Sequence, residues 1–192
     1  TGRDLVRVDR IEQGKVVDPQ DFAAIKYAAE RSNDAAWKRE VDAMVTVQRG
    51  NEAMRGMTVG QGQQTIDALG REFDADGVRS VDEDRVLKAL EENFQRKVKQ
   101  VTESPVDFAL ANGAPVPQAL SFGDAGQARA AVAERVNLAR GVARDQGVVP
   151  GSPFRPADRQ AIAGAIASGD AKQAGVAMES VFAVPDEMLV PA

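Results

Sequence analysis

A phrase that marks the start of a helix occurs twice in full and once in part, and it constrains the fold more than any other feature of the chain. The full copies are Asp18-Pro19-Gln20-Asp21-Phe22-Ala23 and Ser104-Pro105-Val106-Asp107-Phe108-Ala109, and the partial copy is Pro156-Ala157-Asp158. Each begins with a capping side chain or a proline at the first helical position and carries an Asp at the positive end of the helix dipole. The spacings share no period, so several separate helices are predicted rather than a repeat architecture.

Composition excludes whole classes of chemistry. The 192 residues include no cysteine and no histidine, which rules out disulfides, thiolate metal sites, His-based triads and most zinc chemistry. Oxygen-ligand metals and carboxylate pairs remain open, because Asp and Glu together number 29. No cofactor, metal or small-molecule ligand is indicated by any motif. The length suffices for one sizeable core or two small ones.

Charge and hydropathy give expectations about partners and location. The net charge is −5 and no segment forms a basic arm, so nucleic-acid binding is not predicted. No apolar run approaches the roughly 20 residues of a membrane span, and Thr1 to Val17 lacks the apolar centre of a signal peptide. Because the chain opens at Thr1 without methionine and closes without a terminal signal, we interpret it as a piece of a longer protein.

Helical periodicity begins at Pro19 and dominates the first half. Residues 1–17 alternate weakly and predict an extended lead-in or a small hairpin. The segment Ser32-Asn33-Asp34 either breaks or merely interrupts a helical stretch, and glycines at 50, 56, 60 and 62 predict a bend or a mobile connector. Ser80 to Glu83 forms a capping box that opens the clearest helix. That helix carries one apolar stripe, predicted to be the core seam of the first half, at Leu87, Leu90, Phe94, Val98 and Val101.

The second half is rich in alanine and is predicted to be helical as well. Residues 113–123, with two prolines and a terminal glycine, are the best candidate for a linker. After it, one helix carries Val132, Val136, Ala139 and Ala143 on one face, and two shorter helices follow a loop at 146–155. The predicted fold is all-α, an irregular bundle of about six to eight helices. Its parts are the lead-in 1–17, a helical subdomain 18–112, the linker 113–123 and a helical subdomain 124–192.

One stretch is similar to an EF-hand calcium loop. With Asp74 taken as the first position, Asp76 fills the third and Val81 the apolar eighth. Val78 replaces the fifth-position oxygen ligand, Arg79 the required glycine, and Arg85 the bidentate glutamate. We therefore predict an acidic turn between two helices and no metal site.

The pair Glu103-Ser104 resembles the Glu-Ser pair of lytic transglycosylases, in which a glutamate at a helix end is the general acid. Pro105 follows at once, the family's downstream glycine-and-glutamine segment is missing, and no partner carboxylate can be named. A helix end followed by a Ser104 cap explains both residues, so no catalytic residue is predicted.

Three further groups of residues are interpreted structurally. Gly60-Gln61-Gly62 lacks the remaining features of a dinucleotide fingerprint and is predicted to be a flexible connector. An arginine face interleaved with Glu134 and Asp145 favours a solvated surface over an anion site; it consists of Arg129, Arg140 and Arg144. Core packing is the interpretation of Trp37 and of Met44, Met54 and Met57.

The stretch from about Thr102 to Pro185 resembles segments of large internal virion, or ejection, proteins of tailed bacteriophages and prophages. The resemblance rests on the helix start at 104–110, the turn Gln146-Gly147-Val148-Val149-Pro150, the helix start at 154–158 and the break Ala167-Ser168-Gly169-Asp170. In that family such helical segments are spacers and assembly surfaces. The resemblance implies a structural role, protein partners among virion components or copies of itself, and a location in the virion or the bacterial cytoplasm.

The function predicted from the sequence is therefore a non-enzymatic structural or protein-interaction segment. The first alternative is a carboxylate-dependent hydrolase of cell-wall glycan, or its accessory domain, which requires two acidic side chains converging in a cleft. A second alternative, a cytoplasmic helical regulatory module that binds a protein partner, is not separable from the first prediction by sequence.

Overall fold

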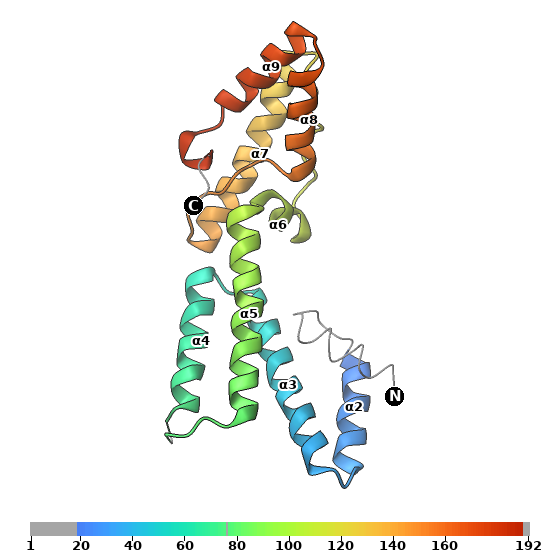
Figure 1. Ribbon diagram of the computed structural model, residues 1–192, viewed down its shortest axis with the longest axis vertical. Coiled ribbons are helices and arrows are strands. Elements are labelled where there is room, and N and C mark those ends of the chain that lie inside the picture. The colour runs from blue at the N-terminus through green and yellow to red at the C-terminus, as the bar shows by residue number, and fades with distance from the viewer. Residues whose placement is uncertain (1–18, 76, 190–192) are drawn as a thin grey trace. The chain divides into compact units, whose positions relative to one another are not determined.

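The computed structural model describes residues 19–75 and 77–189, and this part of the chain is all-helical, as predicted (Figure 1). It contains no strand, and the predicted lead-in 1–17 lies outside it. The helices are α2 (Pro19–Arg31), α3 (Ala35–Arg55), α4 (Val59–Phe73), α5 (Val81–Glu103), α6 (Pro105–Ala111), α7 (Ala125–Gln146), α8 (Pro156–Ala167), α9 (Ala171–Phe182) and the short 3-10 helix η1 (Asp186–Met188).

The chain divides into two compact units, and the division falls after Lys97, inside α5. The sequence placed the boundary at 113–123, but that segment lies within the second unit. There the backbone N–H of Gln118 donates to Glu134 of α7 over 2.8 Å, and the carbonyl of Gln118 accepts from Arg135 over 2.7 Å. Because these bonds tie both backbone polar groups of Gln118 to α7, the proline-containing segment is anchored to that helix.

Helix α5 packs against glycines of its neighbours in the first unit. A Cβ atom built on Gly50 of α3 would lie 2.6 Å from Leu90 Cδ2, and one built on Gly62 of α4 would lie 2.5 Å from Phe94 Cε2. Leu90 and Phe94 are 4% and 3% exposed. The missing side chains therefore let two large apolar side chains of α5 approach the neighbouring backbones closely.

The bend predicted from the glycines lies at Gly56, but Gly50, Gly60 and Gly62 lie inside helices and form no connector. Helix α3 continues through Gly50 to Arg55, and α4 begins at Val59, so only residues 56–58 separate the two helices. Likewise Gly60-Gln61-Gly62 is not a connector, because Gln61 completes a capping box with Thr58 at the start of α4. Packing against α5 outweighs the propensity cost of about 1 kcal/mol per glycine.

Lys97 fixes the C-terminal end of α3 to α5. Its ammonium group donates to the carbonyl oxygens of Met54, over 2.7 Å, and of Met57. The Met54 carbonyl also accepts from the backbone N–H groups of Gly56 and Met57, and a cation at this end complements the helix dipole. Burial lowers the pKa of Lys97, while the carbonyl oxygens favour its charged form.

The helix-start signals are mostly confirmed. Pro19 and Pro156 open α2 and α8, and Asp170 accepts bonds from the N–H groups of Lys172 and Gln173 at the start of α9. Ser80 and Glu83 exchange the two bonds of a capping box, at 2.7 and 3.2 Å. Asp34 caps α3 by accepting from the N–H groups of Ala36 and Trp37, so the segment 32–34 separates two helices.

The predicted side-chain cap at Ser104 is wrong. Pro105 does open α6, but the hydroxyl of Ser104 makes no capping hydrogen bond. Its backbone, with φ −139° and ψ 52°, lies outside the extended conformation usual for a capping residue. The position is therefore the junction between α5 and α6 without the predicted side-chain cap.

The core of the second unit forms around α7, whose small residues let its neighbours pack closely (Figure 1). The predicted apolar face is buried at Val132, Val136, Ala139 and Ala143. Partners come from α6, α8, α9 and the segment after α9, in which Val184 and Met188 are 2% and 1% exposed. Gly147 and Gly169, with φ of 68° and 78°, end α7 and α8, as the predicted breaks required.

The buried position of Leu90 makes the α5 seam testable. Leu90→Ala is expected to cost about 2–5 kcal/mol of unfolding free energy, because it removes apolar contacts and leaves a cavity. The neighbouring exposed change Glu91→Ala should cost under about 0.5 kcal/mol. Denaturant melts of both variants beside the parent check this, and equal melting of the two variants would contradict the assignment of Leu90 to the core.

Candidate functional site

The most strongly built polar cluster is a buried ion pair between α7 and α8. Arg135 holds Asp158 with two bonds, Nε to Oδ2 at 3.0 Å and Nη2 to Oδ1 at 2.9 Å. Their side chains are 3% and 9% exposed. The remaining guanidinium nitrogen, Nη1, donates to the carbonyl oxygens of Gln118 and Ala131. A buried bidentate pair of this kind is strong only when its other polar atoms are also satisfied, as they are here.

A second ion pair extends the cluster to α6. Arg155, which immediately precedes α8, donates from its backbone N–H to Asp158 over 3.0 Å and from Nε to Asp107 over 2.5 Å. In the same connector, a Cβ atom on Gly151 would lie 1.6 Å from the carbonyl oxygen of Thr102. The connector from α7 to α8 therefore rests directly on the backbone where α5 ends, and only glycine fits at 151.

These contacts give the helix-start aspartates a structural role. Asp107 and Asp158 were predicted only to complement helix dipoles, but both also bind arginines of other segments. Each carboxylate is paired with a guanidinium group. The cluster therefore positions α6, α7 and α8.

Sequence reasoning did not identify Arg135. The available signal was its place on α7, three residues after Val132 and directly before Val136 on the apolar face. A charged side chain beside such a face needs a buried partner or a route to solvent. Nothing in the spacing identified Asp158 as that partner, because the contact joins residues that are 23 positions apart.

The ion pair predicts a specific pattern of stability. Asp158→Asn is expected to cost about 3–5 kcal/mol, because it leaves the Arg135 charge buried without a counter-charge. The double variant Arg135→Met, Asp158→Leu should recover much of that loss, since apolar pairs of similar volume replace buried ion pairs at little cost. Urea melts measure both, with Arg129→Met as the exposed control, expected to cost under about 1 kcal/mol. Loss of under about 1 kcal/mol for Asp158→Asn would contradict the burial argument.

In the EF-hand-like segment an arginine holds the acidic side chains. Arg79 donates to Asp74 from Nε at 3.1 Å and from Nη2 at 2.8 Å, and its Nη1 lies 3.5 Å from Asp84. The hydrogen bond to Asp74 is the main reason the pKa of Arg79 is raised. Val81, the supposed apolar eighth position, is 85% exposed, and Asp76 lies outside the described residues. Across 19–75 and 77–189, no three acidic side chains are grouped to hold a metal ion.

Calcium should therefore leave the protein unchanged. Because the Arg79 guanidinium already pairs with both Asp74 and Asp84, adding calcium or a chelator is expected to shift neither the circular dichroism spectrum nor the melting temperature. Differential scanning calorimetry with and without calcium measures this. A calcium-dependent rise in melting temperature would revive the calcium-loop interpretation.

The remaining sequence candidates lie on exposed surfaces or in the core. Glu103 is exposed and lies 3.8 Å from Lys99, one turn earlier in α5. The arginine face is paired with carboxylates, in the pairs Arg129–Glu179, Arg140–Glu187 and Arg144–Asp145. Met44 and Met54 are buried, whereas Trp37 and Met57 are half-buried. The structure brings none of these groups together into a site.

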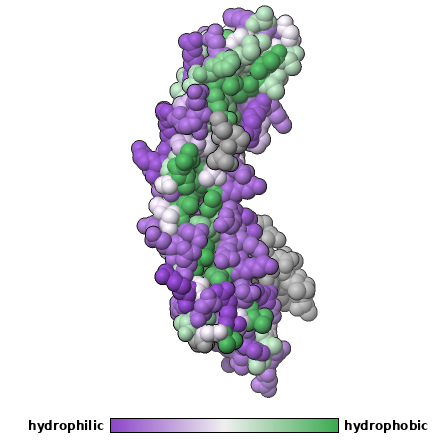
Figure 2. Space-filling model, turned by 60° about the vertical axis from the view of Figure 1, so that its left-hand side comes forward, coloured by the Kyte–Doolittle hydropathy of each residue, from purple (hydrophilic) through white to green (hydrophobic). Residues whose placement is uncertain are grey.

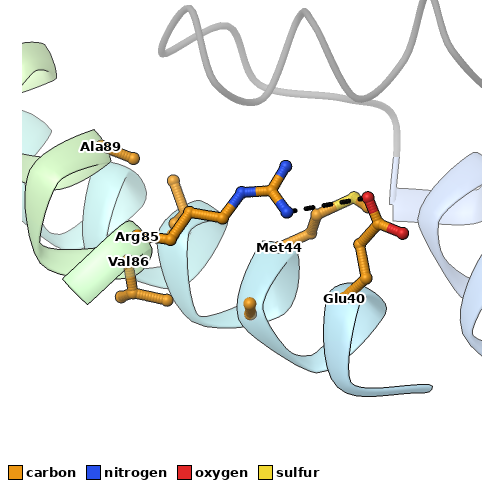
Figure 3. A pocket seen from close by; sticks show the side chains of 7 residues that line it. Glu40, Met44, Arg85, Val86 and Ala89 are labelled. Carbon is orange, nitrogen blue, oxygen red and sulfur yellow. Dashed lines mark ion pairs between the residues drawn. The ribbon is translucent and has the colours of Figure 1, made fainter. Parts of the chain in front are cut away.

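Two hollows lie between α3 and α5 in the first unit. Figure 3 shows the first, where Arg85 of α5 reaches toward Glu40 of α3, with a nitrogen–oxygen distance of 3.8 Å, beside Met44, Val86 and Ala89. Its interior of about 20 Å³ is room for a single water molecule. The second hollow holds about 270 Å³ and is open to solvent.

The second hollow is lined by both apolar and acidic residues. Asp42 of α3 and Asp82 and Glu83 of α5 line it together with Phe73 at the end of α4. Hydrogen bonds from the hydroxyl and the backbone of Ser80 lower the pKa of Glu83. Glu83 therefore stays ionised at neutral pH and is unsuited to donate a proton.

Large apolar side chains are exposed on the last two long helices. On α8 and α9, Ile166 and Met178 are each 45% exposed and Phe182 is 80% exposed. Figure 2 brings the left-hand side of Figure 1 forward and shows apolar surface over part of the second unit. Exposed aromatic and methionine side chains are enriched where proteins contact partners.

Comparison with models of known protein families, with characterised proteins and with solved structures finds no match to this chain. None of the helices in the described ranges is both long and apolar enough to span a lipid bilayer.

Proposed function

We propose that the chain is a non-enzymatic structural or protein-interaction segment that contacts its partner through α8 and α9. The observation that carries the proposal is Phe182, which is 80% exposed at the end of α9, with Met178 one turn earlier. A large aromatic side chain left in water gains free energy when a partner covers it. The two carboxylates of these helices, Asp158 and Glu179, are occupied in ion pairs with Arg135 and Arg129.

The setting we propose is an internal virion protein of a tailed bacteriophage or prophage. The resemblance across residues 102–185 supports it, and so does the use of helix-start aspartates to build a rigid helical unit. A helical regulatory module in the cytoplasm would use the same face. The sequence of the full parent protein distinguishes the two settings, because a capsid, tail or cell-wall-cutting domain on the same chain would establish the virion setting.

Substitution of Phe182 tests the interaction face. Phe182→Ser is expected to weaken self-association or association with virion components while changing unfolding free energy by under about 0.5 kcal/mol. Val116→Ser is the matched control, because Val116 is 79% exposed in the same unit but lies on the connector before α7. Sedimentation velocity and chemical cross-linking compare the variants. The proposal fails if both variants associate like the parent.

The hydrolase alternative has one supporting observation, which is that Asp42 and Asp82 line a single hollow. We expect purified protein not to clear a peptidoglycan suspension, because Glu83 stays ionised and Glu103 lies on an exposed helix end. If the suspension clears, Asp42→Asn and Glu103→Gln locate the activity. Loss of clearing by either variant at an unchanged melting temperature would replace the interaction proposal with an enzyme.

A further inference from the structure

The open hollow between α3 and α5 carries unbalanced charge. Three acidic residues, Asp42, Asp82 and Glu83, line it together with one basic residue, Arg39. The Nε of Arg39 donates to the carbonyl of Ala35 in its own helix over 3.4 Å. The residues that line the hollow therefore carry more negative than positive charge, beside the apolar residues of the same lining.

The carboxylates of this hollow differ from most others placed near a neighbouring helix. Elsewhere Asp74, Asp107 and Asp158 are each held by an arginine at 2.5 to 2.9 Å. Within the described ranges, Asp42 and Asp82 form no ion pair. Two carboxylates beside apolar residues match a ligand that brings its own positive charge.

The apolar residues that line the hollow indicate what kind of cation fits. They are Ala43 of α3, Phe73 at the end of α4 and Val86 of α5. Since the described residues offer no set of three acidic ligands for a metal, an organic cation with an apolar stem fits better than a bare ion. Lysine and arginine side chains have that form, because a methylene stem packs on apolar atoms while the head meets carboxylates.

We propose that this hollow docks a basic, apolar-flanked segment of a partner protein, inserting a lysine or arginine side chain between Asp42 and Asp82. The inference rests on the proposed role in protein interaction but uses a different surface from Phe182. The stem of the inserted lysine or arginine side chain lies on Phe73 and Val86, and its charged head group lies at the two aspartates. The site thus selects partners by charge, whereas α9 binds by apolar contact.

Binding of a synthetic peptide to the whole chain tests the proposal. The probe is an amphipathic helix of leucine and lysine, and the reference is the same peptide with glutamate in place of lysine. We expect the lysine peptide alone to bind and to shift the amide signals of Asp42, Ala43 and Val86 in nitrogen–proton NMR spectra. The double variant Asp42→Asn, Asp82→Asn should weaken binding about tenfold, since each exposed ion pair is worth a modest free energy.

A second double variant separates a site from general attraction. Glu91→Gln, Glu92→Gln removes the same charge from exposed positions of α5 outside the hollow, so it should leave affinity unchanged. Equal weakening by both double variants, shifts confined to other surfaces, or absence of lysine-peptide binding overturns the proposal. Self-association of the chain alone that the Asp42, Asp82 variant abolishes would also overturn it, because the occupant would be a second copy. Phe182→Ser should not change peptide affinity, so failure here and failure of the α9 interface are separate results.

Discussion

The second unit depends on one buried interaction, the bidentate pair between Arg135 and Asp158. The guanidinium group joins α7 to the start of α8 and also binds the carbonyl of Gln118, so one side chain anchors two helices and a connector. Asp158 in turn accepts a hydrogen bond from the backbone N–H of Arg155, whose side chain binds Asp107 of α6. Removing either charge would leave the other buried and unpaired, which costs far more than a surface pair contributes.

The first unit is organised by shape rather than charge. Leu90 and Phe94 of α5 lie against Gly50 and Gly62, where any side chain would overlap them. Lys97 then donates to the carbonyl of Met54 at the end of α3. Because the glycines sit inside helices at a cost in propensity, close packing of the α5 side chains must supply the compensating free energy.

Much of the fold could be predicted, because caps and stripes are local signals. The helix starts at Pro19, Ser80 and Asp170 and the stripe on α5 depend on residues within a few turns of one another. The structure confirms the helix starts and buries Leu87, Leu90, Phe94 and Val101 of the stripe, whereas Val98 is half-buried and lies with Val101 in the second unit. The glycines at 50 and 62 were misinterpreted, since their reason is a contact with α5, distant in sequence. For the same reason the sequence did not reveal the buried role of Arg135, or that Asp42 and Asp82 line one hollow. Contacts between distant segments carry no local pattern from which to predict them.

Asp158 joins α8 to α7 and to the connector before α8, and does not merely cap α8. Amide hydrogen exchange of the Asp158→Asn variant tests this role, because exchange reports the opening of each segment separately. We expect faster exchange at the amide of Gln118 and through α6 and α7 as well as in the first turn of α8. Acceleration confined to that first turn, with α6, α7 and Gln118 protected as in the parent, would contradict it.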